Sequence, residues 1–204
     1  MKRMTIISFL LICGLFATAQ QGMTKITVSH ATSVGIGSFG DFIGKASPRG
    51  FSADLQYFIN DKVSAGLNIG YADFYEKFGR QLYNFGGEDV SAVKTHSVQT
   101  IPILAKVGYN KLRGDNSIFQ PYAALGIGMN VIMYEEWWGS LVDQQNKWAF
   151  VAAPEIGTRI AFNKYSAKGI DIALRYHYSP VKIYDVRNVQ TISLNVGFFW
   201  FGRN

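Results

Sequence analysis

Residues 51–71 decide the fold, because they read FSADLQYFINDKVSAGLNIGY and alternate apolar with small or polar side chains on either side of a polar turn. On the first half, one face carries Phe51, Ala53, Leu55, Tyr57 and Ile59, with Phe58 as an apolar exception on the other face. On the second half, one face carries Val63, Ala65, Leu67, Ile69 and Tyr71. A period of two is typical of a β-strand between two different environments. The joining residues 60–62 favour a tight turn, so the stretch predicts a β-hairpin.

The same alternation continues to the end of the chain. It predicts strands near residues 25–38, 49–60, 62–76, 95–111, 118–136, 148–163, 168–180 and 189–203. The second and third, fourth and fifth, and sixth and seventh strands are joined by short turns. The other connections are generally longer, and we expect the longest loop from about Glu76 to Lys94. An even number of strands with short turns and both termini at one end predicts an all-β fold, an eight-stranded antiparallel up-and-down transmembrane β-barrel.

The two strand faces differ in a way that separates a membrane barrel from a soluble one. A soluble β-sandwich or lipocalin-like barrel would need many charged residues on the face opposite the apolar one. In the last strand, Ile192, Leu194, Val196, Phe198 and Trp200 instead lie opposite Thr191, Ser193, Asn195 and Gly197. The apolar face therefore indicates contact with lipid, and the small polar face indicates a narrow lumen.

Aromatic residues gather at the predicted strand ends, where headgroups meet amphipathic rings. One belt, at the end with the termini, comprises Tyr57, Tyr109, Phe119, Phe162 and Trp200. The other belt comprises Tyr71, Tyr134, Trp137, Trp138 and Trp148.

Composition excludes several other classes of protein. Only 17% of the 204 residues are charged, against about 25% in typical soluble domains. The 26 Tyr and Phe residues exclude a disordered chain, and the single cysteine, Cys13, excludes a disulfide scaffold. Without Lys2 and Arg3, 18 basic residues remain against 14 acidic ones, a net charge of +4. This modest, scattered charge predicts no nucleic-acid partner.

The first nineteen residues have the pattern of a cleaved signal peptide. Lys2 and Arg3 precede an apolar stretch over residues 6–16, which is too short to span a bilayer as a helix. Small residues at 17–19 then favour cleavage before Gln20. We therefore expect a signal peptide at 1–19 and one barrel domain at 20–204. Lipidation at Cys13 is the weaker alternative, because Ile12 stands where a small residue would be needed.

The glycine-rich segment 120–128, QPYAALGIG, and the closing strand with Asn195, Gly197 and Trp200 carry a family resemblance. The chain resembles the small eight-stranded outer-membrane β-barrel proteins of Gram-negative bacteria, the OmpX/OmpW-like group with a generic outer-membrane β-barrel domain. The resemblance implies a monomer in the cell outer membrane, surrounded by lipid and lipopolysaccharide and inserted by the barrel assembly machinery.

Three motifs could indicate other chemistry. Residues 35–40 fit the dinucleotide pattern GxGxxG, but residues 41–45 show no helical period after it, and glycines facing a crowded lumen explain the pattern better. Residues 113–115 spell the integrin-type tripeptide RGD in a predicted turn, where turn chemistry is the simpler cause. The histidines His30, His96 and His177 lack metal-ligand spacing. We expect no metal and no cofactor.

Residues 176–179, YHYS, resemble the catalytic strand of the lipid A 3-O-deacylases, in which a Ser–His–acid triad cuts an ester. Pro180 stands where that family has Asn, and the nearest downstream acid, Asp185, lies in a predicted loop. Alternation also turns His177 and Ser179 toward the lumen, away from lipid. We therefore expect no catalytic residues and interpret His177 as a luminal histidine.

Six charged residues project inward by the same alternation: Asp54, Lys106, Glu155, Arg159, Asp171 and Arg175. Unpaired charges in a narrow lumen are costly, so these should pair. Antiparallel neighbours share a constant sum of residue numbers. Arg159 with Asp171, and Glu155 with Arg175, both give 330, which predicts one register for the sixth and seventh strands. The network indicates either a plug that locks the barrel shut or a gate whose ion pairs exchange.

Two classes of function follow. The first is a non-enzymatic membrane protein whose loops serve binding, adhesion or envelope integrity. The alternative is a conduit for small or apolar solutes, which the resemblance to OmpW-like proteins suggests. A lipid A deacylase is a distant third.

Overall fold

A computed structural model describes residues 22–85, 88–110, 118–138, 141–164, 166–183 and 186–203. The expected signal peptide, including Cys13, lies outside the described residues. The tripeptide at 113–115 and Asp185 also lie outside them. Within the described part, no helix has the length and apolar character needed to cross a bilayer.

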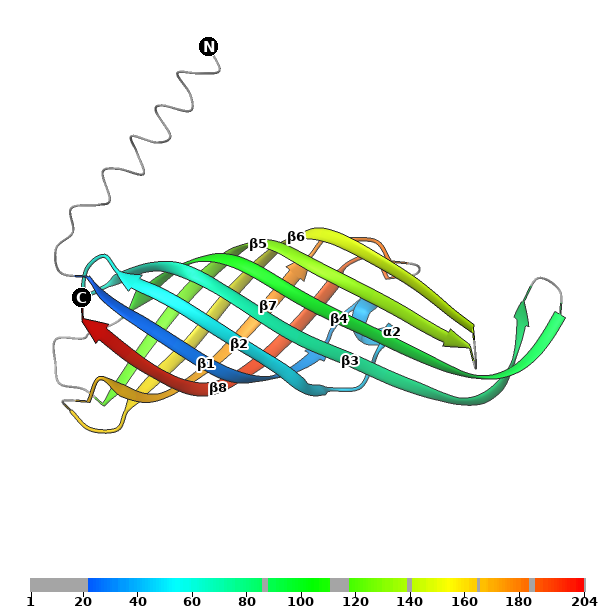
Figure 1. Ribbon diagram of the computed structural model, residues 1–204, viewed down its shortest axis with the longest axis horizontal. Helices are drawn as coiled ribbons and strands as arrows, with labels where there is room; N and C mark the ends of the chain where they lie inside the picture. The colour runs from blue at the N-terminus through cyan, green and yellow to red at the C-terminus, as the bar shows by residue number, and fades with distance from the viewer. Residues whose placement is uncertain are drawn as a thin grey trace, which may run out of the picture.

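The strands form one closed antiparallel barrel in sequence order, with β8 returning to β1 (Figure 1). They are β1 (Met23–Gly35), β2 (Ser47–Phe58), β3 (Val63–Phe85), β4 (Glu88–Asn110), β5 (Phe119–Trp138), β6 (Leu141–Ala161), β7 (Lys168–Ser179) and β8 (Val189–Arg203). Met23 pairs with Arg203, so β1 begins and β8 ends at the same end of the barrel. The predicted fold class is confirmed.

The wall has an apolar outer face and a polar inner one. Leu67 and Ile156 are 60% and 63% exposed on the outside, whereas Asn68 and Ser193 are 1% and 3% exposed on the inside. Phe58 is buried inside, as its place on the polar face predicted. The prediction that Tyr134 belongs to the outer aromatic belt is wrong, because its side chain is buried inside the molecule.

The prediction of a long loop at 76–94 is wrong, because β3 continues to Phe85 and β4 begins at Glu88. β6 likewise begins at Leu141 and not near 148. The polar residues that suggested a loop still pair through their backbones, since a strand outside the membrane needs no apolar face. A β-bulge between Lys77 and Arg80 interrupts the alternation there.

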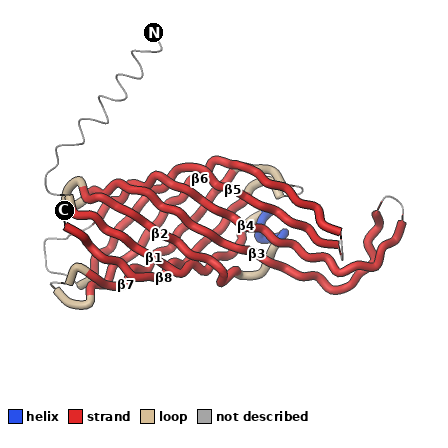
Figure 2. The backbone as a smooth tube through the Cα atoms, in the orientation of Figure 1, coloured by secondary structure: helices blue, strands red, loops and turns tan. Residues whose placement is uncertain are grey.

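The outer halves of β3, β4, β5 and β6 therefore form a four-stranded sheet beyond the barrel, which we call the outer extension (Figure 2). It starts where the flanking strands stop. The outermost pair of β2 with β3 is Gly50 with Ala72, and the outermost pair of β6 with β7 is Ala152 with Tyr178. Most of the expected loop length on this side is strand.

A short helix, α2 (Ser38–Phe42), follows β1, although residues 41–45 showed no helical period. Of the glycines in the GxGxxG pattern, Gly35 ends β1, Gly37 precedes the helix and Gly40 lies within it, so they do not form a strand face along the lumen, which corrects the expectation. Gly37 has a φ of +57°, and a Cβ on Gly40 would lie 2.7 Å from the Gly35 carbonyl oxygen. The helix lies at the outer end of the barrel (Figure 1).

Candidate functional site

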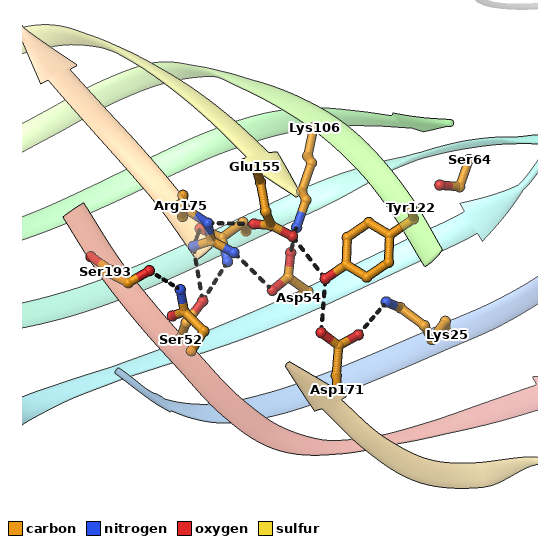
Figure 3. A network of polar contacts seen from close by, with 12 residues as sticks. Lys25, Ser52, Asp54, Ser64, Lys106, Tyr122, Glu155, Asp171, Arg175 and Ser193 are labelled. Carbon is orange, nitrogen blue, oxygen red and sulfur yellow. Dashed lines mark hydrogen bonds and ion pairs between the residues drawn. The ribbon is translucent and has the colours of Figure 1, made fainter. Parts of the chain in front are cut away.

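Four buried charged residues form a closed ring of ion pairs in the lumen, which we call the charge quartet: Asp54, Lys106, Glu155 and Arg175 (Figure 3). The Lys106 ammonium lies 2.7 Å from Asp54 Oδ1 and 2.7 Å from Glu155 Oε1. Arg175 Nε lies 2.5 Å from Glu155 Oε2, and its Nη2 lies 3.4 Å from Asp54 Oδ2. Each acid therefore contacts both bases.

The quartet crosses the lumen from wall to wall. Asp54 is on β2 and Glu155 on β6, which are opposite strands in a ring of eight. Two acids balance two bases, and Arg175 Nη1 also donates to Ser52 Oγ and Asn68 Oδ1 at 3.1 and 3.0 Å. Such complete pairing offsets the cost of removing four charges from water.

A second group beside the quartet continues the network (Figure 3). It lies toward the end with the termini, because Lys25 is near the start of β1 and Asp171 near the start of β7. The Tyr122 hydroxyl donates to Glu155 Oε1 at 3.0 Å and lies 2.7 Å from Asp171 Oδ1. Lys25 Nζ lies 3.3 Å from Asp171 Oδ2. Arg159 donates to Asn110 Oδ1, and its guanidinium lies 5.0 Å from the centre of the Tyr122 ring.

The register predicted for β6 and β7 is confirmed: Glu155 pairs with Arg175, and Arg159 with Asp171. The side-chain contacts follow this register only in part, because Asp171 of β7 forms its ion pair with Lys25 of β1, on the far side of β8. The sequence reasoning missed Lys25 and Tyr122. Extending the alternation of β1 back from Thr27 would have placed Lys25 inside.

Above the quartet, apolar side chains fill the outer mouth of the barrel. This mouth plug comprises Phe39, Ile43, Ala72, Phe74, Val98, Ile132, Tyr134, Ala149, Ile183, Val186 and Val189. Phe39, from α2, meets Phe74 edge to face, with ring centres 5.1 Å apart. The plug therefore joins the segment after β1 to the inner faces of strands around the mouth.

His96 holds the same helix from the side. Its ring stacks on Phe42 at 4.0 Å, and its Nδ1 lies 3.3 Å from the Phe42 carbonyl oxygen. Its Nε2 lies 3.3 Å from Glu136 Oε1. His96 pairs with Glu76 in the outer extension, and burial lowers the pKa of its imidazole.

A cavity of about 30 Å³ separates the two closures. Arg175 of the quartet and Val189 of the mouth plug both line it, together with Asn130 and His177. This volume accommodates about one or two water molecules. It is far smaller than a site for an organic solute, roughly 300–1,000 Å³.

His177 and Ser179 do not form a nucleophile–base pair within the described residues. His177 Nδ1 lies 3.4 Å from Thr191 Oγ1, whereas the buried Ser179 hydroxyl accepts a bond of 3.2 Å from Asn130 Nδ2. An activated serine needs its base within hydrogen-bond reach. The part of the chain that the structure describes also contains no cluster of three or more His, Cys, Asp or Glu residues that could hold a metal ion.

The fold and the filled lumen define a small transmembrane β-barrel protein. The chain belongs to the outer membrane protein beta-barrel domain family, whose model matches residues 7–198. This membership indicates a location in the outer membrane. No curated protein matches the chain by sequence.

Solved structures with the same fold include neisserial surface protein A (NspA), which is 16% identical with a TM-score of 0.53. That similarity covers 88% of this chain and 96% of NspA. OprG of Pseudomonas aeruginosa is 14% identical with a TM-score of 0.47, over 90% of this chain and 94% of OprG. Ail, the attachment invasion locus protein of Yersinia pestis, is 16% identical with a TM-score of 0.44, over 89% and 99% of the two chains.

Proposed function

We propose that the protein is a closed, non-enzymatic outer-membrane anchor that presents the outer extension for binding, adhesion or envelope integrity. The charge quartet is the observation that carries this proposal, because it joins opposite walls of the lumen. The mouth plug blocks the same path a second time. A filled lumen favours a plug that keeps the barrel shut over a gate that opens. It also leaves no open path along which a solute could cross the barrel.

The outer extension supplies the surface for such binding. In it, strands β3 to β6 extend beyond the level at which their pairing with β2 and β7 ends. Leu82 and Tyr75 are 74% and 44% exposed there. Apolar and aromatic side chains exposed outside the barrel are suited to contact with another macromolecule.

Planar-bilayer recording on the refolded wild-type protein tests the closed lumen. We expect no steady single-channel conductance, because both closures would have to open together. A faster gel mobility before boiling than after it confirms that the barrel is folded in the same sample. Stable conductance steps from protein folded by this criterion would favour the conduit alternative.

The non-enzymatic part of the proposal has its own test. We expect lipid A in cells that express the wild type, His177→Ala or Ser179→Ala to keep the same acyl chains by mass spectrometry. The reason is that His177 and Ser179 have separate partners and both face the lumen. Acyl loss with the wild type but not with either variant would establish a deacylase instead.

A further inference from the structure

We propose that the outside of the barrel binds one anionic phospholipid between β7 and β8, at the end that holds both termini. A surface groove of about 370 Å³ lies there. We call it the rim groove, and it is lined by Phe162, Lys168, Gly169, Phe198, Phe199 and Trp200. Its volume falls within the range of small-molecule sites, roughly 300–1,000 Å³.

The walls of the rim groove suit an acyl chain. Phe162 and Phe198 are 61% and 63% exposed, and Trp200 is also exposed. Gly169 has no side chain, and the side chain of Phe199 is buried, so these two residues contribute main chain to the groove. Three aromatic side chains therefore surround a bottom formed by main chain, and a flexible hydrocarbon chain can fill the space between them.

Lys168 supplies a charged end to this apolar groove. It is exposed and directly opposite Trp200 in the pairing of β7 with β8. The turn before it holds its main chain: Ser166 Oγ donates to the Lys168 carbonyl oxygen at 2.8 Å and accepts from the Lys168 amide at 3.0 Å. The Phe162 amide donates to the same carbonyl at 3.1 Å. The position of Lys168 relative to the aromatic walls is thus fixed by hydrogen bonds.

The charge of Lys168 is free to meet a lipid. Within the described residues, no carboxylate forms an ion pair with its ammonium. A cation at the edge of an aromatic belt lies at the level of lipid headgroups. The phosphate of an anionic phospholipid would then contact Lys168 while one of its chains lies along Phe198 and Trp200. In a zwitterionic lipid, the headgroup amine cancels much of this attraction.

The location identifies the lipid class. The end with the termini faces the periplasm in outer-membrane barrels, and the leaflet on that side consists of glycerophospholipid. Lipopolysaccharide occupies the opposite leaflet, so it does not reach Lys168. The occupant is therefore a glycerophospholipid with net negative charge, and phosphatidylglycerol is a suitable probe.

Trp200 reports directly on the groove. Substituting Trp137, Trp138 and Trp148 by Phe leaves it as the chain's single tryptophan, because the chain has four. This variant is folded into phosphatidylcholine bilayers that contain a small fraction of brominated phosphatidylglycerol or brominated phosphatidylcholine. We expect phosphatidylglycerol to be preferred roughly fivefold at the site, the effect of one basic residue near a membrane surface. The preference is measured as stronger quenching of Trp200 fluorescence by brominated phosphatidylglycerol than by brominated phosphatidylcholine at equal mole fraction.

Two further variants of this single-tryptophan protein test whether the rim groove causes the preference for phosphatidylglycerol. Lys168→Gln should reduce the quenching by phosphatidylglycerol to the level of phosphatidylcholine. Lys164→Gln removes an exposed charge from the same turn, outside the groove lining, and should leave the preference intact. Equal quenching by both lipids in the parent protein would overturn the proposal. So would a preference that survives Lys168→Gln or that falls equally in both variants.

Discussion

Replacing Glu155 by glutamine is expected to lower the free energy of unfolding by about 3–5 kcal/mol, the cost of removing one partner from a buried ion pair. Glu155 contacts Lys106, Arg175 and Tyr122 at once. Its neutral amide would leave two buried cations to share Asp54 alone. Urea unfolding of the protein in detergent or lipid, followed by gel mobility without boiling, measures the change.

Two controls make this result specific to the charge quartet. Asp73→Asn removes an acid from the pair with Arg49, which lies 3.4 Å away and is largely exposed, so it should cost at most about 1 kcal/mol. Glu155→Gln combined with Arg175→Gln restores one acid to one base. The double variant should be less destabilised than the sum of the single ones. Additive costs would show that the quartet does not act as a unit.

The same Glu155→Gln variant separates a plug from a gate. A plug predicts lower stability without steady conductance, since the mouth plug remains in place above the cavity. A gate predicts higher conductance from a barrel of nearly unchanged stability. Recording conductance and stability on one refolded sample therefore gives opposite outcomes for the two mechanisms.

The barrel wall was predictable from sequence because two simple rules determine it. Alternation assigns each side chain to lipid or lumen, and constant residue sums assign neighbours across a turn. Together they gave the pairing of Glu155 with Arg175. They cannot give contacts across the lumen, because a long side chain such as that of Lys25 reaches past its register neighbours to Asp171.

The outer end was harder to predict, because the membrane no longer imposes an apolar face there. Polar residues such as Glu76 and Lys77 suggested a loop, yet the backbone of β3 pairs with β4 through them. The five residues of α2 are also too few for a helical period to be visible. Phe39 and Phe42 gave no signal in sequence that they contact strands distant along the chain.

Replacing Phe39 by alanine is expected to cost about 3–5 kcal/mol, the usual effect of truncating a buried aromatic side chain. Phe39 is only 1% exposed and packs edge-on against Phe74. The loss should fall mainly on the mouth plug, because α2 is held by β1, β8, His96 and the plug itself. Hydrogen exchange of the backbone amides at residues 36–46 should therefore accelerate, whereas the amides of β7 keep their protection.

Phe39→Leu is the matched control, because it retains an apolar side chain in the plug and should cost less than Phe39→Ala. The conductance of Phe39→Ala links the plug to the proposed function. The quartet below the cavity stays intact, so the variant should remain closed in planar bilayers even though α2 is loosened. Steady conductance from Phe39→Ala would mean that the mouth plug alone seals the barrel, and that the ion pairs between Asp54, Lys106, Glu155 and Arg175 leave room for solutes to pass.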